Sequence, residues 1–336
     1  MLLRQLIAAI AAIATHHAAK ACTVCTNESP EPIELSPAPW TLKGDIYGVF
    51  LLPGLGIPLL GNSLPAKAFG PLERQYPASI AGEFAGKIGM IQVLRYTDSP
   101  VGSYDELLII PGGFRYENNG TMQEGLRVSR IYVSQKYTAW NGRTNWNIPK
   151  HLARFDWTYG ADGSPSVKIY PYDTAGDSSE SRPSEKPFFQ MTFAPLLPQN
   201  FLNNTLGTLL PGFLPNGLNL NPTVPFTTDL YALLGIDATL VQPPVPQGND
   251  SFGALGAGGP NWKSVVPGQF TDKAILGTIN MDQAGGDGEA TGFNAVGDEF
   301  ERNFWPGLLR NNIGVRMQDA TITFSEATEL PNVIAA

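Results

Sequence analysis

Glycine and proline recur along the whole chain, 36 and 29 times in 336 residues. Both residues disfavour helix interiors, so their number excludes a helical bundle. The apolar runs between them are short and rich in Val, Ile, Tyr and Phe, which is typical of β-strands. We therefore expect a mainly β (α+β) fold with long loops. Strands are predicted over residues 40–50, 87–96, 105–111, 128–137, 155–159, 167–172, 187–194 and 313–324, and a short helix over 298–310.

These strands predict a single domain over residues 39–328, preceded by a Pro-, Glu- and Ser-rich linker over 22–38 and followed by a tail over 329–336. Polar or Pro- and Gly-rich stretches interrupt the strand pattern and predict loop insertions. They lie at about 173–187, 196–226 and 242–268. The last of them includes a Gly-rich run over 253–259, which lacks the Gly-x-Gly-x-x-Gly spacing of a dinucleotide-binding loop.

Residues 1–21 have the pattern of a signal peptide. Arg4 precedes an apolar stretch that is too short to span a bilayer, and Ala19-Lys20-Ala21 has the small-x-small pattern of a cleavage site. This predicts a secreted protein, and four glycosylation acceptors begin at Asn27, Asn119, Asn203 and Asn249. The alternative is an amphipathic helix or a wrong start codon, which would leave the protein cytoplasmic. Cys22 and Cys25 have C-x-x-C spacing, and we expect them to form a small disulfide or to remain as thiols without a function. A redox pair or half of a zinc site are the alternatives.

The charge balance excludes several classes of partner. A net charge of -8 and a pI near 5.0 disfavour nucleic acid and anionic membrane surfaces, which need concentrated positive charge. No membrane span is predicted. The chain has three histidines, and a cleaved signal would leave only His151, so a multi-histidine zinc site is excluded. Because H-E-x-x-H, G-x-S-x-G and Walker motifs are missing as well, we expect no metal and no cofactor.

Two remaining motifs indicate amine chemistry. The first is Gly102-Ser103-Tyr104-Asp105-Glu106, and the second runs from Gly142-Arg143 to Pro149-Lys150-His151-Leu152. Together they resemble the acetoacetate decarboxylase-like family, whose members have Gly-x-Tyr-x-Glu and, further on, Gly-Arg-Glu, a short apolar spacer and Tyr-Pro-Lys-Lys-Leu. The resemblance covers residues 40–324 and is strongest over 96–153. It implies a cone-like antiparallel β-barrel of the acetoacetate decarboxylase type, here with long Pro/Gly-rich loops.

The same resemblance implies that Lys150 forms a Schiff base and that Glu106 is the acid or base beside it. An amine attacks a ketone only when neutral, and an ordinary lysine with a pKa near 10.4 is less than about 0.1% neutral at pH 7. Burial favours the neutral amine. The residues expected to supply an apolar wall are Trp140, Trp146, Ile148 and Leu152.

Three further motif residues have expected supporting roles. Tyr104 is expected to pack with a partner for its hydroxyl, or to orient the substrate. Arg143 is expected to pair with a carboxylate and hold the lysine loop in place. His151 is either a capped surface residue or a proton donor.

Three positions depart from the family pattern. The family's second lysine is His151 here, its glutamate after Gly-Arg is Thr144, and its substrate-binding arginine aligns with Asp45. Arginine binds a carboxylate through two parallel hydrogen bonds, whereas an aspartate repels one, so Asp45 argues against acetoacetate itself as the substrate. Lys43 or Arg95 are the candidates to replace the arginine.

Three functional hypotheses follow. The first is a lysine-dependent, decarboxylase-like lyase that acts on a small keto acid or related keto compound. The second is a non-catalytic protein of the same fold that binds an apolar small molecule, which the loss of the arginine, lysine and glutamate favours. The third is a secreted interaction protein whose Pro-rich loops make the contacts. The family resemblance also implies a homo-oligomer.

Overall fold

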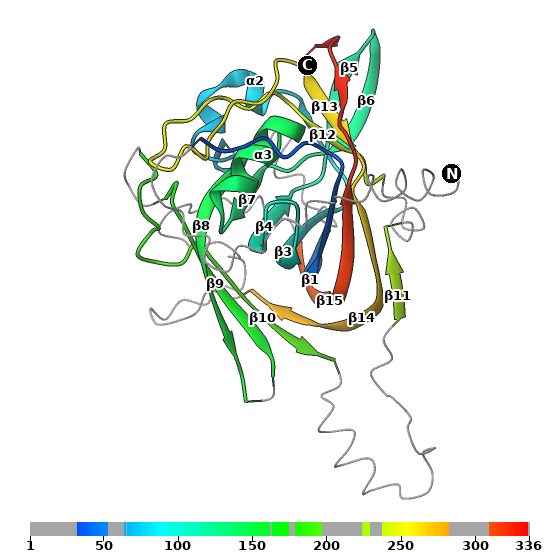
Figure 1. Ribbon diagram of the computed structural model, residues 1–336. Coiled ribbons are helices and arrows are strands. Elements are labelled where there is room, and N and C mark those ends of the chain that lie inside the picture. The colour runs from blue at the N-terminus through cyan, green and yellow to red at the C-terminus, as the bar shows by residue number, and fades with distance from the viewer. Residues whose placement is uncertain are drawn as a thin grey trace, which may run out of the picture.

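The structure is a computed structural model, which describes residues 32–52, 64, 66–161, 163–174, 179–196, 224–228, 237–281 and 309–334. It is mainly β, as predicted. Ten strands form one large sheet in the order β10-β9-β8-β7-β4-β3-β1-β15-β14-β11. Strand β10 pairs with β14 as well, so nine of these strands form a closed ring of neighbours (Figure 1). In chain order the strands are β1 (Trp40–Leu52), β3 (Gly89–Asp98), β4 (Tyr104–Ile110), β7 (Arg130–Val133), β8 (Lys150–Tyr159), β9 (Pro165–Pro171), β10 (Phe189–Pro195), β11 (Val224–Thr227), β14 (Gly268–Asn280) and β15 (Leu309–Phe324).

A second sheet joins the C-terminal residues to the middle of the chain. Its order is β16-β13-β12-β6-β5-β17, with β2 paired to β5. The predicted tail over 329–336 is therefore wrong as a free segment, because β16 pairs with β13 and β17 pairs with β5. The strands are β2 (Glu83–Gly86), β5 (Gly113–Asn118), β6 (Thr121–Leu126), β12 (Leu240–Gln242), β13 (Trp262–Val265), β16 (Thr328–Leu330) and β17 (Val333–Ile334).

The large sheet carries a hydrophobic core on each face. Alternate side chains of a strand point to opposite faces, and in β3 Met90 and Leu94 belong to one core while Ile91 and Val93 belong to the other. The first core also contains Leu126 and Leu240 of the second sheet and Trp146 of helix α3 (Lys136–Trp146). We call this the helix-covered face, because Trp146 of α3 packs in this core and α3 contacts β7 and β8 (Figure 1).

Helix α3 corrects one expectation and qualifies another. A strand was predicted over 128–137, but β7 ends at Val133 and α3 begins three residues later, where the side chain of Gln135 accepts a hydrogen bond from the backbone N–H of Thr138. The helix ends at Asn147, whose left-handed φ of 55° is typical of a helix C-terminus. A helix between two strands allows them to be parallel, and β7 and β8 are. Apart from β6–β12, the remaining pairings are antiparallel, as expected.

Two short helical segments lie before β2 and help to position the site, namely η2 (Glu73–Gln75) and α2 (Pro77–Ile80); η1 (Ala66–Ala68) precedes them. The predicted loop over 242–268 contains β13, and residues 173–174 and 179–187 have no helix or strand. The predicted signal, Cys22, Cys25, most of the 196–226 loop and most of the 298–310 helix lie outside the described residues. Within the described residues, no helix is long and apolar enough to cross a membrane.

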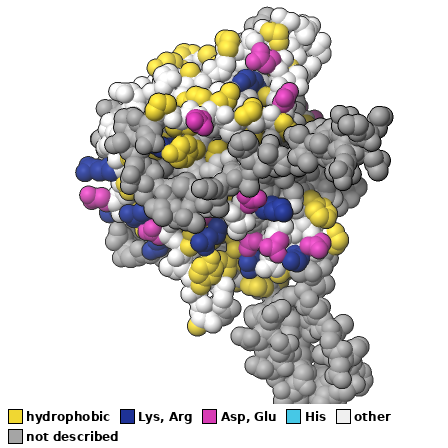
Figure 2. Space-filling model, in the orientation of Figure 1, with side chains coloured by type: hydrophobic (Ala, Val, Ile, Leu, Met, Phe, Trp, Pro, Cys, Tyr) yellow, Lys and Arg dark blue, Asp and Glu magenta, His cyan; other side chains and the backbone are white. Residues whose placement is uncertain are grey.

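The surface seen in Figure 2 mixes acidic and basic side chains, with no concentration of Lys and Arg over any element. This arrangement agrees with the acidic composition of the chain. It offers no extended cationic surface on this face for a polyanion.

Candidate active site

The first motif forms the turn and the start of strand β4. Gly102 has a left-handed φ of 91°, and its N–H donates to the carbonyl of Ser99 at 3.0 Å, which closes the turn between β3 and β4. Tyr104 and Glu106 are two residues apart in the strand, so both side chains point to the helix-covered face. Both are buried. The spacing Gly-x-Tyr-x-Glu therefore places a phenol and a carboxylate side by side.

The second motif brings Lys150 to the same carboxylate. Lys150 is the first residue of β8 and is 5% exposed. Its Nζ lies 2.7 Å from Oε2 of Glu106 and 3.0 Å from the Thr138 hydroxyl, and 5.2 Å from the centre of the Tyr104 ring. A buried amine thus has a carboxylate as a proton acceptor and a hydroxyl as a second partner.

Gly142 is required by this arrangement. A Cβ at this position of α3 would lie 2.6 Å from Cδ and 2.8 Å from Cε of Lys150. Such distances are far inside van der Waals contact, which begins at about 3.5 Å between carbon atoms. The glycine of the second motif therefore leaves the space through which the lysine side chain runs.

Two tyrosines complete the polar group. The Tyr96 hydroxyl donates to Oε1 of Glu106 at 3.2 Å, and its ring lies 4.5 Å from that of Tyr104. Burial and the Glu106 carboxylate raise the pKa of Tyr96 and of Tyr104 well above the usual value. Both phenols therefore keep their protons and can donate hydrogen bonds near Glu106.

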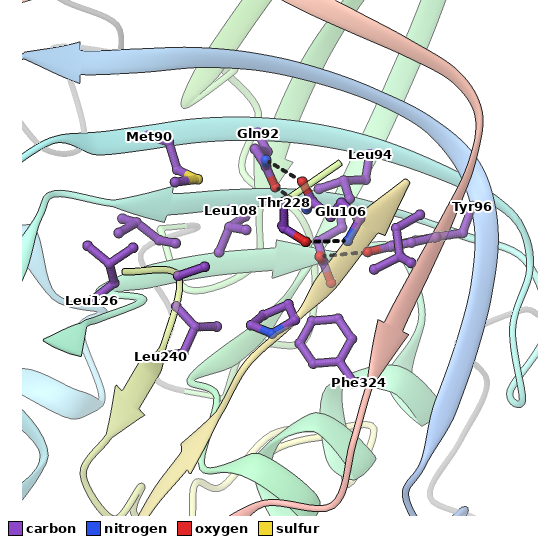
Figure 3. A pocket seen from close by; sticks show the side chains of 15 residues that line it. Met90, Gln92, Leu94, Tyr96, Glu106, Leu108, Leu126, Thr228, Leu240 and Phe324 are labelled. Carbon is purple, nitrogen blue, oxygen red and sulfur yellow. Dashed lines mark hydrogen bonds between the residues drawn. The ribbon is translucent and has the colours of Figure 1, made fainter. Parts of the chain in front are cut away.

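A pocket of about 480 Å³, part of it open to solvent, adjoins this group. Glu106 and Tyr96 belong to its lining, and Figure 3 shows both near Phe324 and Thr228. Lys150 is not part of the lining and is joined to it by the ion pair with Glu106. Much of the remaining wall is apolar: Met90, Leu94, Leu108, Ile110, Leu126, Ala238, Leu240, Pro267, Ile322 and Phe324.

The pocket has a second polar point away from Glu106. Gln92 of β3 and Gln269 of β14 exchange two amide hydrogen bonds, of 3.2 and 3.0 Å. Both line the pocket, and Figure 3 labels Gln92 there. The Thr228 hydroxyl accepts from the backbone N–H of Gln269 at 3.3 Å. No lysine or arginine is among the lining residues that the structure describes.

His151 lies on the opposite face of β8 from Lys150. Its Nε2 is 2.8 Å from Oε2 of Glu73, and its Nδ1 is 3.1 Å from Oε1 of Glu180. Burial disfavours the charged imidazole, but the two carboxylates outweigh it and raise the pKa of His151 well above the usual value. Burial likewise opposes ionisation of Glu73, but His151 and Arg143 lower its pKa to about 2. His151 is therefore a buried cation in an ion-pair cluster.

Arg143 joins this cluster to the lysine strand. Its guanidinium donates to Oε1 of Glu73 at 2.9 Å and to the carbonyl of Lys150 at 3.3 Å. It also donates to the carbonyls of Pro246 and Gly256 in the 242–268 segment. Arg143 thus fixes the backbone of Lys150 through its carbonyl group.

The other predicted wall residues support the pocket from farther away. Trp146 and Ile148 are buried in the core of the helix-covered face, and the Trp146 ring lies 5.4 Å from that of the lining residue Phe324. Trp140 packs near Gly256 instead and does not line the pocket.

Asp45 stands at the position that aligns with the family's arginine, and it forms an ion pair. Asp45 accepts from the Arg316 guanidinium at 2.7 Å. Neither Lys43 nor Arg95 replaces the missing arginine in the pocket, because Lys43 is exposed and the Arg95 guanidinium stacks on Trp157 at 5.1 Å. Thr144 lies in α3 and is not a lining residue.

Sequence reasoning missed Thr138, Tyr96, Glu73 and the glutamine pair. Tyr96 was open to prediction, because a hairpin that closes at Gly102 pairs Tyr96 with Tyr104 across β3 and β4. Thr138 was missed because the strand predicted over 128–137 runs past the end of β7 and into the start of α3, which hides the helix that carries Thr138. Glu73, Gln92 and Gln269 come from distant parts of the chain, and no local pattern marks them.

Comparison with known proteins gives fold-level likenesses. No family model matches the chain, and no curated protein matches it. Acetoacetate decarboxylase from Legionella pneumophila is 12% identical with a TM-score of 0.46, over 89% of this chain and 91% of that one. A second acetoacetate decarboxylase structure is 11% identical with a TM-score of 0.47, over the same shares. An acetoacetate decarboxylase-like enzyme from Sphingomonas wittichii is 10% identical with a TM-score of 0.44, over 88% and 94%. All three structures are of acetoacetate decarboxylases or a related enzyme, the family that the two motifs of the sequence resemble.

Proposed function

We propose that this protein is a lysine-dependent, decarboxylase-like lyase that forms an imine with a small keto acid or related keto compound. The observation that carries the proposal is the 2.7 Å contact between the buried Lys150 amine and the Glu106 carboxylate at the edge of an apolar pocket. Lys150 is the nucleophile, Glu106 the acid and base, and Tyr96 and Thr138 hold them in place.

Imine formation begins with a proton transfer inside the ion pair. The Lys150 ammonium gives a proton to Glu106, and the neutral amine adds to the ketone carbon. The resulting carbinolamine loses its hydroxyl as water when Glu106 returns the proton. The product is an iminium ion beside the Glu106 carboxylate.

The iminium then accepts an electron pair. In a β-keto acid, the bond between the carboxylate carbon and the α-carbon breaks, carbon dioxide leaves, and the electron pair moves to the nitrogen to give an enamine. The α-carbon takes up one solvent proton, which Glu106 can relay. Water then hydrolyses the new iminium, which releases the ketone and restores the ion pair.

A second candidate function is binding without turnover. It is favoured by the apolar wall and by the lack of Lys and Arg among the described lining residues, since a keto acid brings a carboxylate that needs a partner. In that case the pocket holds an apolar small molecule, and Lys150 and Glu106 are a buried ion pair only.

Deuterium exchange into acetone in D₂O, followed by proton NMR, separates the two functions because it reports the enamine directly. We expect the wild-type protein to accelerate exchange, Lys150→Met to abolish it, and Glu106→Gln to slow it by about 100-fold or more, the usual contribution of a positioned acid or base. Lys43→Met, which removes an exposed lysine, is the matched control and should exchange like wild type. Exchange that survives in Lys150→Met would exclude the proposed nucleophile.

A further inference from the structure

Both members of the glutamine pair line the main pocket. Gln92 and Met90 also line a second, smaller hollow. Gln92 is 3% exposed and Gln269 is 9% exposed. A ligand in the main pocket therefore meets the two amides at its border.

Buried amides in an apolar wall must be hydrogen-bonded. Here Gln92 and Gln269 satisfy each other through two reciprocal bonds that link β3 to β14 across the pocket. An apolar pair would fill such a place at lower cost, because amides lose hydration on burial. A ligand group that both donates and accepts hydrogen bonds can replace one amide as the partner of the other.

The charge of the lining restricts that ligand group. Glu106 is the one ionisable carboxylate among the described lining residues, and no lysine or arginine faces it from the lining. A second carboxylate next to the amides would be desolvated without a cation. An amide or hydroxyl group would be desolvated at much lower cost and is matched by a carboxamide pair.

We propose that Gln92 and Gln269 are specificity-determining residues that select keto compounds whose far end is an uncharged hydrogen-bonding group, such as an amide, on an apolar chain. The inference rests on the proposed function only in that the ketone of the compound reacts with Lys150. The recognition by the amides is independent of the imine. A ligand that separates the two amides must supply hydrogen bonds in their place, so a ligand without such a group leaves them unpaired and binds less well.

The test uses methyl ketones of matched size: 6-oxoheptanamide, 6-oxoheptanoate and 2-octanone. Each is titrated with borohydride present, and the adduct on Lys150 is measured by mass spectrometry. We expect the amide to half-saturate the wild-type protein at a concentration about tenfold below the other two, the ratio expected for one net hydrogen bond. Gln92→Leu and Gln269→Leu should remove that preference and leave 2-octanone unchanged or better. Gln123→Leu, which changes an exposed glutamine of β6 outside the pocket, is the matched control and should keep the preference.

Calorimetric titration with heptanamide, heptanoate and 1-heptanol decides the inference even where no adduct forms, because these probes have no ketone. Tighter binding of heptanamide and heptanol than of heptanoate, lost in both Gln→Leu variants, supports the amide site whether or not Lys150 reacts. Equal binding of all three probes, or a preference that survives both variants, overturns it. A merely structural amide pair would lower Tm in the variants without changing the order of the ligands.

Discussion

At the residue scale, the buried Lys150–Glu106 pair is better explained by chemistry than by stability. Two charges removed from water lose hydration that their attraction repays only partly, so apolar replacements of a buried pair are often neutral or stabilising. The side chains of Lys150 and Glu106 are only 6% and 4% exposed. A protein that needed stability alone would gain little from this pair.

Substitutions in the Lys150–Glu106 pair should change the free energy of unfolding non-additively. Lys150→Met or Glu106→Gln alone should destabilise the fold by about 3–5 kcal/mol, the cost of leaving one buried charge without its partner. The double variant Lys150→Met/Glu106→Gln should recover most of that loss. Denaturant unfolding of the four proteins measures the coupling, and additive losses would show that the pair does not act as a unit.

The variant Gly142→Ala tests the Lys150 site without weakening helix α3. Alanine favours a helix over glycine by about 1 kcal/mol, but here its Cβ would collide with the Lys150 stem. We expect imine trapping to fall at least about tenfold while Tm changes little. Thr144→Ala in the same helix is the control and should trap normally. Normal trapping by Gly142→Ala would mean that the lysine reaches its partner by another route.

The sequence motifs single out Lys150 and Glu106, which the structure brings into contact, because both lie in short local patterns. Tyr104 and Glu106 share a strand, and Gly142 and Lys150 are eight residues apart on a helix and the strand that follows. Asp45 shows the limit of such patterns, since its ion pair with Arg316 joins residues at opposite ends of the chain. The glutamine pair was unpredictable for the same reason, since its members are 177 residues apart in the sequence.

At the scale of elements, the ion-pair cluster fastens η2, α3 and β8 together. Glu73 of η2 contacts Arg143 of α3 and His151 of β8, and Arg143 contacts the carbonyl of Lys150. The strand predicted over 128–137 contains β7 but ends too late, because the sequence around Gln135 suits both a strand end and a helix cap. Helix α3 connects β7 to β8 and so allows the two strands to be parallel. This pairing sets the position of Lys150, the first residue of β8.

The cluster predicts a definite pH dependence of stability. His151 has a raised pKa in the folded protein, so its ionised contacts stabilise the fold fully below pH about 6.5 and are lost as pH rises through the folded pKa. We expect the Tm difference between wild type and His151→Gln to be larger at pH 6 than at pH 10. An equal difference at both pH values would show that His151 is neutral in the fold.

Glu73 predicts the opposite pH dependence of stability, at acid pH. Its folded pKa of about 2 lies below the ordinary value of 4.5, so its contribution is present above pH 4.5 and is lost as pH falls towards 2. Glu73→Gln should therefore lower Tm at pH 6 and much less at pH 2.5. Thermal unfolding at the two pH values tests this, and a loss of the same size at both would contradict the cluster.

At the scale of the whole molecule, the second sheet ties the C-terminal strands to the pocket. Leu126 of β6 and Leu240 of β12 line the pocket, and β16 and β17 complete the same sheet through β13 and β5. Composition predicted the mainly β class correctly, because Gly and Pro density is a property of the whole chain. It could not predict which strands pair, since the second sheet joins segments more than 200 residues apart.

Removal of residues 328–336 should therefore destabilise the protein and expose sheet edges. We expect a lower Tm, by about 2–4 °C for each kcal/mol lost, and a greater tendency to aggregate, because β13 and β5 would each lose a neighbour. Thermal unfolding and light scattering measure both effects. An unchanged Tm would show that β16 and β17 contribute nothing to the second sheet.

The central claim is that Lys150 forms an imine, and borohydride trapping followed by peptide mass spectrometry tests it most directly. The protein is incubated with acetoacetate and, separately, with 2,4-pentanedione, then reduced and digested. The account predicts a stable adduct on the peptide that contains Lys150, absent from Lys150→Met and present in Lys43→Met. No adduct on this peptide with either compound between pH 5 and 9, in a protein that is folded, would contradict it.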